Sequence, residues 1–205
     1  FGTFSEECDD EAIVYGITTP LNTWNPVWAN IHIFAGMIRD AWHTKKISDK
    51  LRVFTCRTGW RPDDVRARFP EKKVSLDTFS KYNPELSGTS KVCITALYFL
   101  ATAIYFWMAV QAANLTILQL TLALCITLML LVSIGMLADR SQRAGRWEVL
   151  RLVISLALLG YANFSELFSH NLILAGTSLV LSSSAISWLA LRSRATQTDL
   201  RPAAG

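Results

Sequence analysis

The sequence predicts an all-α integral membrane protein, in which a cytoplasmic segment with an amphipathic helix precedes four transmembrane helices. The main observation is that no charged side chain occurs between Lys91 and Asp139. A helix needs about 20 apolar residues to cross a hydrocarbon core of ~30 Å, so this run is long enough for two crossings. Two further apolar runs follow closer to the C-terminus, and basic residues gather in the segments around the runs.

A polar turn at residues 111–114 divides the long uncharged run into two spans. The third run reaches spanning length if Arg151 extends its guanidinium toward the membrane surface. The fourth contains serines and small residues, which favour close helix packing in lipid. The expected spans are residues 92–110, 115–138, 149–168 and 171–191, followed by a cytoplasmic tail, 192–205.

The distribution of basic residues sets the expected topology. Of the 20 Lys and Arg residues, 13 precede the first span, four lie in residues 139–151 and three follow the fourth span. Four spans put these regions on one face, which the positive-inside rule identifies as cytoplasmic, so both termini are expected there. The expected location is a bacterial inner membrane or the endoplasmic reticulum. The net charge of +4 is therefore interpreted as a topology signal and not as a sign of nucleic-acid binding.

The N-terminal region, residues 1–70, is followed by a polar linker, residues 71–91. Within the region, Asn25 and Pro26 predict a helix start, because Asn is a favoured N-cap and Pro fits the first helical position. Apolar side chains at helical spacing then form one face: Trp28, Ile31, Ala35, Ile38 and Trp42. This face can pack on a soluble core or lie in the membrane interface.

Two shorter helices are expected next. Ser48 is placed to cap the first of them. The second begins near Pro62, with the carboxylates of Asp63 and Asp64 at the positive end of the helix dipole, and Pro70 ends it. Because Asp63 and Asp64 are adjacent, their side chains diverge and do not form an acid/base pair on one face.

No catalytic or metal-binding residue is assigned from the residues alone. The common hydrolase, nucleotide-binding and metalloprotease motifs are absent from the sequence. Three histidines, at positions 32, 43 and 170, are too few for a multi-histidine iron or zinc site. Glu166 and His170 have helix-face spacing, but a plain pair at a wet helix end is favoured over a proton relay. The four cysteines lie far apart, which favours free buried thiols.

Several short sequence motifs of the chain occur together, and in the same order, in one known protein family. Phe1-Gly2-Thr3-Phe4 leads into an acidic loop and then into Val14-Tyr15-Gly16-Ile17. The pattern continues at residues 25–32, 49–52, 59–62, 133–140 and 148–151. These stretches resemble the sterol desaturase/fatty acid hydroxylase superfamily, and within it the C-terminal half of alkylglycerol monooxygenase and its bacterial relatives.

The resemblance implies a C-terminal portion of a membrane di-iron lipid oxygenase, in which residues 1–70 are the C-terminal end of the cytoplasmic-facing oxygenase domain. In the superfamily the iron is held by histidine clusters, which lie upstream of the position that matches Phe1. The chain begins without Met, and we expect a missing N-terminal half that contains these histidines. The complete enzyme would hydroxylate a lipid substrate with iron and O₂. In the alkylglycerol monooxygenase branch the target carbon lies beside a glyceryl ether oxygen, and tetrahydrobiopterin is the reductant.

The role of this portion is expected to be membrane anchoring and the shaping of an apolar route for lipid. Phe99, Phe106 and Leu128 could line such a route, although packing against lipid is the simpler interpretation of each. His32 matches a position where related sequences carry histidine, so the resemblance implies a place beside the active site or along a substrate channel. A lone helical histidine is otherwise a packing or hydrogen-bonding residue.

Two other classes of function remain as alternatives. The chain could be a non-catalytic membrane adaptor or scaffold, complete in itself, although Met37 is its first methionine. A small transporter is the third interpretation, and it is disfavoured because charges embedded in the expected spans are scarce and no internal repeat is visible.

Overall fold

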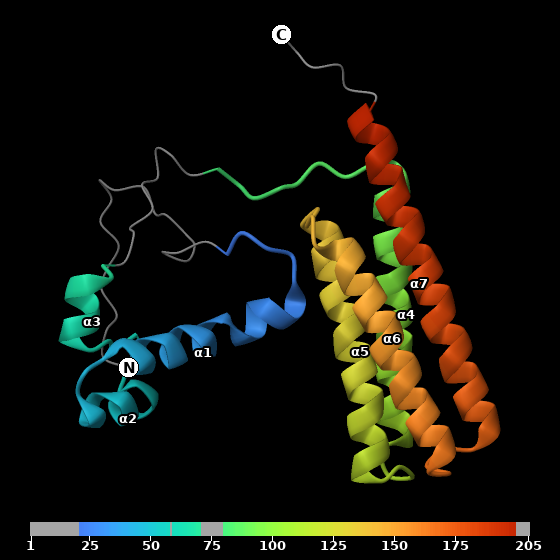
Figure 1. The fold of residues 1–205 in the computed structure, drawn as a ribbon, viewed down its shortest axis with the longest axis horizontal. Coiled ribbons are helices and arrows are strands. Elements are labelled where there is room, and N and C mark those ends of the chain that lie inside the picture. The colour runs from blue at the N-terminus through green and yellow to red at the C-terminus, as the bar shows by residue number, and fades with distance from the viewer. Residues whose placement is uncertain (1–20, 58, 71–79, 200–205) are drawn as a thin grey trace, which may run out of the picture. The chain divides into compact units, whose positions relative to one another are not determined.

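The computed structural model describes residues 21–57, 59–70 and 80–199, with side chains as far as Arg194. The predictions for residues 1–20, which include Cys8 and the acidic loop, and for residues 71–79 of the linker lie outside the described residues. The described part contains seven helices and no strand, which confirms the all-α fold class (Figure 1). The chain forms two compact units: a small unit centred on residues 39–81, and a larger one of residues 23–38 and 82–205.

Helix α1 (Pro26–His43) begins where the sequence predicts. The Asn25 side chain caps it, because Oδ1 accepts hydrogen bonds from the backbone N–H groups of Val27 at 3.0 Å and Trp28 at 3.2 Å. None of its side chains is buried, and its large apolar side chains are exposed: Trp28, Ile31, Ile33, Phe34, Ile38 and Trp42. The exposed apolar face is compatible with both expected surroundings of this helix.

The small unit is held together by hydrogen bonds to two aspartates. Arg61 donates from Nε to Asp40 Oδ2 at 2.6 Å and from Nη2 to Oδ1 at 3.1 Å. Asp64 accepts from the Thr44 hydroxyl at 3.1 Å and from the Lys45 backbone N–H at 3.0 Å. These contacts join the end of α1 and the residues after it to α3 (Asp63–Arg68) and to the segment before α3. Helix α2 (Ile47–Thr55) lies between them in the chain, and the buried apolar side chains of the two short helices are Val53 and Val65.

Helix α2 starts differently from the prediction. Its N-cap is Lys46, which makes no side-chain capping hydrogen bond, and Ser48 lies within the helix. The extended backbone of Lys46, with φ −88° and ψ 123°, sets the start of this helix without a capping side chain. Helix α3 begins directly after Pro62, as expected.

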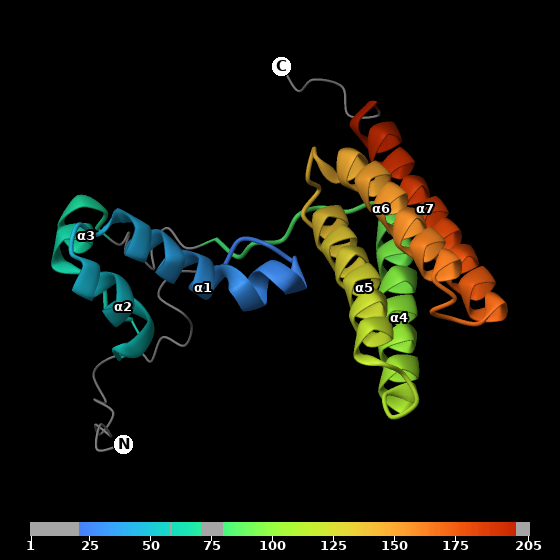
Figure 2. The same cartoon turned by 60° about the horizontal axis from the view of Figure 1, so that its bottom comes forward.

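Four long helices form the bundle, which comprises α4 (Gly88–Gln111), α5 (Ile117–Ala138), α6 (Ala144–Phe164) and α7 (His170–Asp199). Each is long and apolar enough to cross a membrane, α7 over His170–Arg194. Helix α4 packs against α5 and α7, and α6 packs against the same two helices, so the four form a closed ring (Figures 1 and 2). Four membrane-spanning helices are therefore confirmed.

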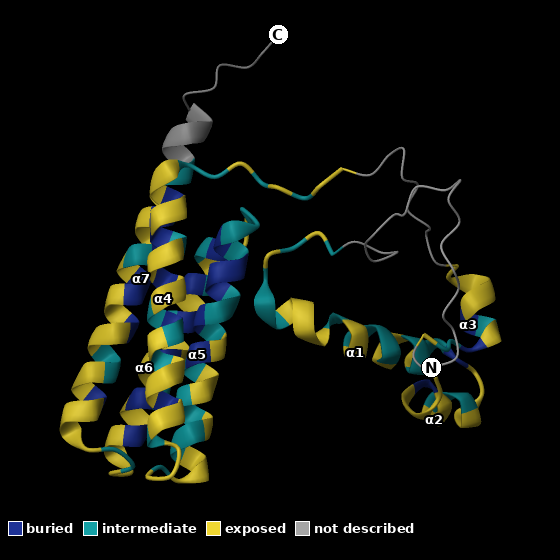
Figure 3. Ribbon diagram, turned by 180° about the vertical axis from the view of Figure 1, so that it is seen from behind, coloured by how far each residue is buried: buried dark blue, intermediate teal, exposed yellow. Residues whose placement is uncertain are grey.

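The bundle is apolar on the outside and polar at selected points inside. Its outward faces are exposed, and the buried residues lie between the helices (Figure 3). Two buried apolar clusters lie in the interior, one around Leu97, Leu130 and Leu137, and the other around Leu159 and Val180. Buried serines from α4, α5, α6 and α7 accompany them. This arrangement suits a bundle surrounded by lipid, where only the interior can satisfy polar groups.

Short, capped turns connect the helices. Thr116 and Gln119 form a capping box at the start of α5, and Ser87 caps α4. Glu166, which follows α6, has a positive φ of 52° and donates its N–H to Asn163 O at 3.2 Å. It lies in this turn and is exposed, while His170 begins α7, so the expected Glu166–His170 pairing on one helix face is wrong.

The segment that leads into α1 is fixed to the end of α5 by Asp139. The Asp139 carboxylate accepts hydrogen bonds from the Thr23 hydroxyl, from the Trp24 backbone N–H at 2.6 Å and from the Tyr82 hydroxyl at 3.1 Å. Burial, assisted by the hydrogen bond to this carboxylate, raises the pKa of Tyr82. A Cβ at Gly135 would overlap Asn25, so the close approach of the two segments requires glycine there.

Candidate functional site

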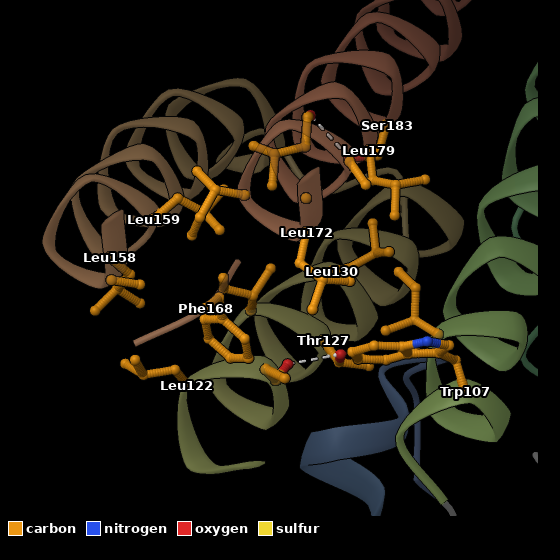
Figure 4. Close-up of a pocket in the computed structure, with 18 of the residues that line it drawn as sticks. Trp107, Leu122, Thr127, Leu130, Leu158, Leu159, Phe168, Leu172, Leu179 and Ser183 are labelled. Atoms are coloured by element: carbon orange, nitrogen blue, oxygen red, sulfur yellow. Dashed lines mark hydrogen bonds between the residues drawn. The ribbon is translucent and has the colours of Figure 1, made fainter. Parts of the chain in front are cut away.

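A cavity of about 400 Å³ lies between the four helices of the bundle. Its walls are mainly leucine, isoleucine, alanine and aromatic side chains, as the close-up shows (Figure 4). Helices α4 and α5 contribute Trp107, Leu122, Thr127 and Leu130, and the opposite wall contains Leu158, Leu159, Phe168, Leu172, Leu179 and Ser183. Cavities of this size and character are typical of small-molecule sites.

The cavity is apolar because each helix is apolar on most of its circumference. The ring arrangement turns one side of each helix inward, and the small residues Ala123 and Gly176 leave space between the larger side chains. Gly176 contacts Leu159 closely, since a Cβ there would lie 3.1 Å from Leu159 Cδ2. The helices thus pack closely at some points along the bundle, and small side chains leave the space of the cavity at others.

Arg151 is the one charged side chain among the described residues that line the cavity. It lies on α6 about 10 Å along the helix from Ala144, from the helical rise per residue, and is 1% exposed. Glu148, also 1% exposed, lies one turn earlier on the same helix. Its Oε2 accepts from Arg151 Nη2 at 2.8 Å and from Nε at 3.2 Å. The two form a buried ion pair.

Two serines of α7 complete the surroundings of the guanidinium. Arg151 Nη1 donates to Ser183 Oγ at 3.1 Å, and Nη2 donates to Ser184 Oγ at 2.9 Å. Ser183 in turn donates to the Val180 carbonyl at 2.9 Å, so its oxygen acts as the acceptor toward Arg151. The ion pair on α6 is therefore hydrogen-bonded directly to α7.

Three buried oxygens near this level have no hydrogen-bond partner among the described residues: Glu148 Oε1, Ser155 Oγ and Ser187 Oγ. Ser155 follows Arg151 by one turn on α6. Ser187 follows Ser183 by one turn on α7. A buried polar atom without a partner is destabilising by about 1–3 kcal/mol, which makes such atoms candidates for contact with water or a ligand.

A buried ion pair in a membrane helix is more often explained by function than by a gain in stability. Removing both charges is often neutral or stabilising, whereas removing one partner leaves an unpaired charge and is destabilising by about 3–5 kcal/mol. Ionisable side chains inside membrane bundles are uncommon and frequently mark functional sites. We therefore treat the cavity together with Glu148, Arg151, Ser183 and Ser184 as the candidate site, and call these four residues the polar cluster.

This site is not predicted from the sequence. Arg151 was expected to extend toward the membrane surface, but it is buried and paired with Glu148. The pair also explains why the helix covers Ala144–Phe164 and not 149–168: Glu148 lies inside the helix because Arg151 neutralises it. The opposite charges three positions apart, and the serines at 183, 184 and 187, were the available signal. Two charged side chains are thus embedded in the bundle, so the scarcity of such charges counts less against a transporter.

The other residues singled out from the sequence lie elsewhere. Phe99, Phe106 and Leu128 are exposed on the outer surface of the bundle and do not line the cavity, which agrees with the simpler interpretation of packing against lipid and not with an internal route. His32 is half-buried on α1, and its Nδ1 lies 2.9 Å from the Ala29 carbonyl oxygen. It does not line the cavity, and its expected role stays a prediction.

The described residues do not fit the iron that the resemblance implies. No group of three or more His, Cys, Asp or Glu side chains within them is arranged to hold a metal ion. Of the cysteines described, Cys93 is buried whereas Cys56 and Cys125 are exposed, and all three are free thiols. The expectation of buried thiols therefore holds for Cys93 and is wrong for the other two.

Comparison with known proteins points to one group of enzymes. The chain is 29% identical over 170 residues to the alkylglycerol monooxygenase of Homo sapiens, which covers 82% of this chain and 37% of that protein. It is 31% identical over 163 residues to the alkylglycerol monooxygenase of Xenopus tropicalis, covering 78% and 36%. No protein-family model matches the chain, and no solved structure does. The match spans little more than a third of the relatives' length, and the chain is similar to alkylglycerol monooxygenases over that region.

Proposed function

We propose that the chain is the membrane-embedded C-terminal portion of a lipid monooxygenase of the alkylglycerol monooxygenase kind, within the sterol desaturase/fatty acid hydroxylase superfamily. The observation that carries the proposal is the identity of 29–31% to two such enzymes over about four-fifths of the chain. The four membrane-spanning helices support it, because an enzyme that acts on long-chain lipids benefits from being held at the bilayer.

The part played by this chain is to anchor and position the enzyme. The four spans hold it in the bilayer, and the basic segments before α4, between α5 and α6, and after α7 favour both termini in the cytoplasm. The contacts of Asp139 with Thr23, Trp24 and Tyr82 tie the segment leading into α1 to the cytoplasmic end of the bundle in this topology. Preceding catalytic residues would thereby be held at the membrane surface.

The redox chemistry belongs to another part of the enzyme in this proposal. The iron that the superfamily uses requires histidine ligands, and the described residues supply no such set. A histidine-containing portion, joined to this chain or associated with it, would hold the iron, with tetrahydrobiopterin as a candidate reductant. The substrate would be a glyceryl ether lipid, whose cleavage follows hydroxylation of the carbon beside the ether oxygen.

The test is to isolate the native protein from membranes with an antibody to residues 1–91 and to measure its intact mass, iron content and turnover of a glyceryl ether lipid. The proposal expects iron at about two atoms per complex, with either a mass well above 22.9 kDa or a co-purifying histidine-bearing chain. A protein of 22.9 kDa without iron, partner or turnover would refute the proposal and favour the adaptor.

A second experiment tests the anchoring role alone. Residues 92–191 would be deleted from the complete protein, and its distribution between membrane and soluble fractions would be measured. We expect release from membranes at alkaline pH and high salt, because all four spans are lost. A truncated protein that still floats with membranes would contradict the anchoring role, whatever its activity.

A further inference from the structure

The cavity has one strongly polar point in an otherwise apolar lining. Trp107 and Thr127 contribute weakly polar groups on one wall, and Arg151 and Ser183 lie together on another. Ser183 and Leu172, which both line the cavity, are about 16 Å apart along the axis of α7, from the helical rise per residue. The cavity thus extends lengthwise through the bundle, with its charged group toward one end.

One N–H group of the Arg151 guanidinium donates no hydrogen bond to the described residues. Glu148, Ser183 and Ser184 accept hydrogen bonds from all but one of its N–H groups. The remaining N–H is on Nη1, for which the described residues supply only the Ser183 acceptor. Arg151 and Ser183 both line the cavity, whereas Glu148 and Ser184 do not. The unused N–H therefore belongs to the one charged side chain that lines the cavity among the described residues, on the nitrogen bonded to Ser183, which also lines it.

The surroundings determine which molecule fits. The bundle crosses a bilayer, so hydrocarbon chains are the molecules present around it at high concentration. An elongated apolar cavity of about 400 Å³ suits a chain, and a single N–H donor suits an acceptor oxygen at the end of that chain. Glu148 already neutralises Arg151, so an anionic head would add an uncompensated charge to a buried site. A neutral head avoids this penalty.

We propose that the cavity is a binding site for one neutral single-chain lipid, whose chain lies among the apolar residues and whose head oxygen accepts a hydrogen bond from the remaining Nη1 N–H of Arg151. The site lies within the bundle and uses none of the residues expected to hold iron. It therefore stands or falls independently of the oxygenase function. Its role would be to hold a lipid inside the bundle, with Arg151 discriminating between head groups.

The experiment uses the full chain in nanodiscs of phosphatidylcholine and a hexadecanol analogue that carries a diazirine in its chain. After irradiation, the labelled peptides are mapped by mass spectrometry. Labelling is repeated in the presence of unlabelled hexadecanol, palmitic acid or hexadecane. We expect labels on cavity-lining residues of α5, α6 and α7, and we expect hexadecanol to compete about tenfold better than the other two.

Two variants and one control locate the site. Ala123→Phe fills the cavity from α5 and is expected to abolish the labelling of lining residues. Ala109→Phe makes the same change at an exposed position of α4 that does not line the cavity, and labelling should be unchanged. Glu148→Gln with Arg151→Met removes the donor without leaving an unpaired charge, and the advantage of hexadecanol over hexadecane should disappear.

The outcomes separate cleanly. Labels confined to outward-facing residues, or labels on lining residues that persist in Ala123→Phe, would overturn the cavity as the binding site. Palmitic acid competing as well as hexadecanol would overturn the neutral-head assignment. If the double variant does not fold, as judged by circular dichroism and size-exclusion chromatography, the Ala123→Phe comparison and the competition series on the unmodified chain still decide the proposal.

Discussion

Among the described residues, a short arginine–carboxylate ion pair occurs in each of the two units, and the two pairs differ in their access to water. In the small unit, Arg61 Nε lies 2.6 Å from Asp40 Oδ2, and the side chains are 17% and 15% exposed. In the bundle, Arg151 Nη2 lies 2.8 Å from Glu148 Oε2, and both side chains are 1% exposed. The geometry of the two pairs is similar, so their energetic consequences depend on access to water.

Access to water determines how much stability is lost when one member of an ion pair is removed. In the small unit the remaining charge can be hydrated after a modest rearrangement, so the pair is worth little more than its hydrogen bonds. In the bundle the remaining charge would stay among apolar side chains, with lipid beyond them. Asp40–Arg61 therefore stabilises the fold of the small unit. Glu148 and Arg151 depend on each other, because either charge alone would be buried without a partner, and a functional role explains the presence of both.

The largest expected effect comes from removing one member of the buried ion pair. Arg151→Met should destabilise α6 and α7 by about 3–5 kcal/mol, because Glu148 loses its partner. The matched variant Arg61→Met should destabilise the small unit by about 1 kcal/mol. Hydrogen exchange by mass spectrometry, on the full chain in nanodiscs, resolves the segments 144–194 and 39–70 separately.

A third variant separates charge from shape in the same experiment. Glu148→Gln combined with Arg151→Met should recover most of the lost protection in 144–194, because no unpaired charge remains. If Arg151→Met has no more effect than Arg61→Met, water reaches the buried pair and the contrast between the two units is wrong.

A second effect tests the packing of the bundle end. Gly135→Ala should destabilise the larger unit by about 1–3 kcal/mol, because the new Cβ would overlap Asn25 and displace the N-cap of α1. Gly160→Ala is the control, since a Cβ there meets nothing within 4 Å. Faster hydrogen exchange at the amides of Val27 and Trp28 in Gly135→Ala alone would support the close approach. Equal exchange in the two variants would show that the segment before α1 is not held against α5.

A smaller effect is expected at the turn between α6 and α7. Glu166 occupies a left-handed conformation, with φ 52°, at a position where glycine carries no steric penalty. Glu166→Gly should therefore stabilise the bundle by about 1 kcal/mol. Ser165→Gly, at a residue with φ −85°, should not stabilise it. Thermal unfolding in detergent micelles, followed by circular dichroism, compares them. A loss of stability in Glu166→Gly would indicate that the exposed carboxylate makes a favourable contribution that outweighs the backbone strain.

The spans and the start of α1 could be predicted from the sequence because their signals are local. A run without charges and the Asn25–Pro26 pair each specify a structure within a few residues. The start of α2 could not be predicted from the same rule. Ser48 is a good capping residue and would start the helix at Asp49, but the helix begins two residues earlier, at Ile47, where no side chain caps it.

The polar cluster could not be predicted because it depends on contacts between helices. Hydropathy treats each residue separately. Glu148 was therefore placed outside the expected third span, and Arg151 was expected to reach the membrane surface, although the two side chains neutralise each other inside α6. The serines that hold Arg151 come from α7, and which face of α7 meets α6 is decided by packing. The same reason explains the outward position of Phe106, because a helix that is apolar on all sides gives no signal for its inward face.

The smallest expected effect is a pH dependence confined to the small unit. The hydrogen bond from the Lys45 backbone, assisted by Thr44, holds the pKa of Asp64 below its ordinary value of 3.8. A carboxyl group with a lowered pKa in the folded state stabilises that state above the ordinary pKa, and the contribution is lost as pH falls through the folded value. Hydrogen exchange at Lys45, corrected for intrinsic rate, should therefore become faster relative to neutral pH below about pH 4. Asp64→Asn should remove this dependence and leave the bundle unchanged. Because Asp64 is partly open to water, the loss should be modest, and a bundle that lost protection over the same pH range would show that the two units do not respond separately.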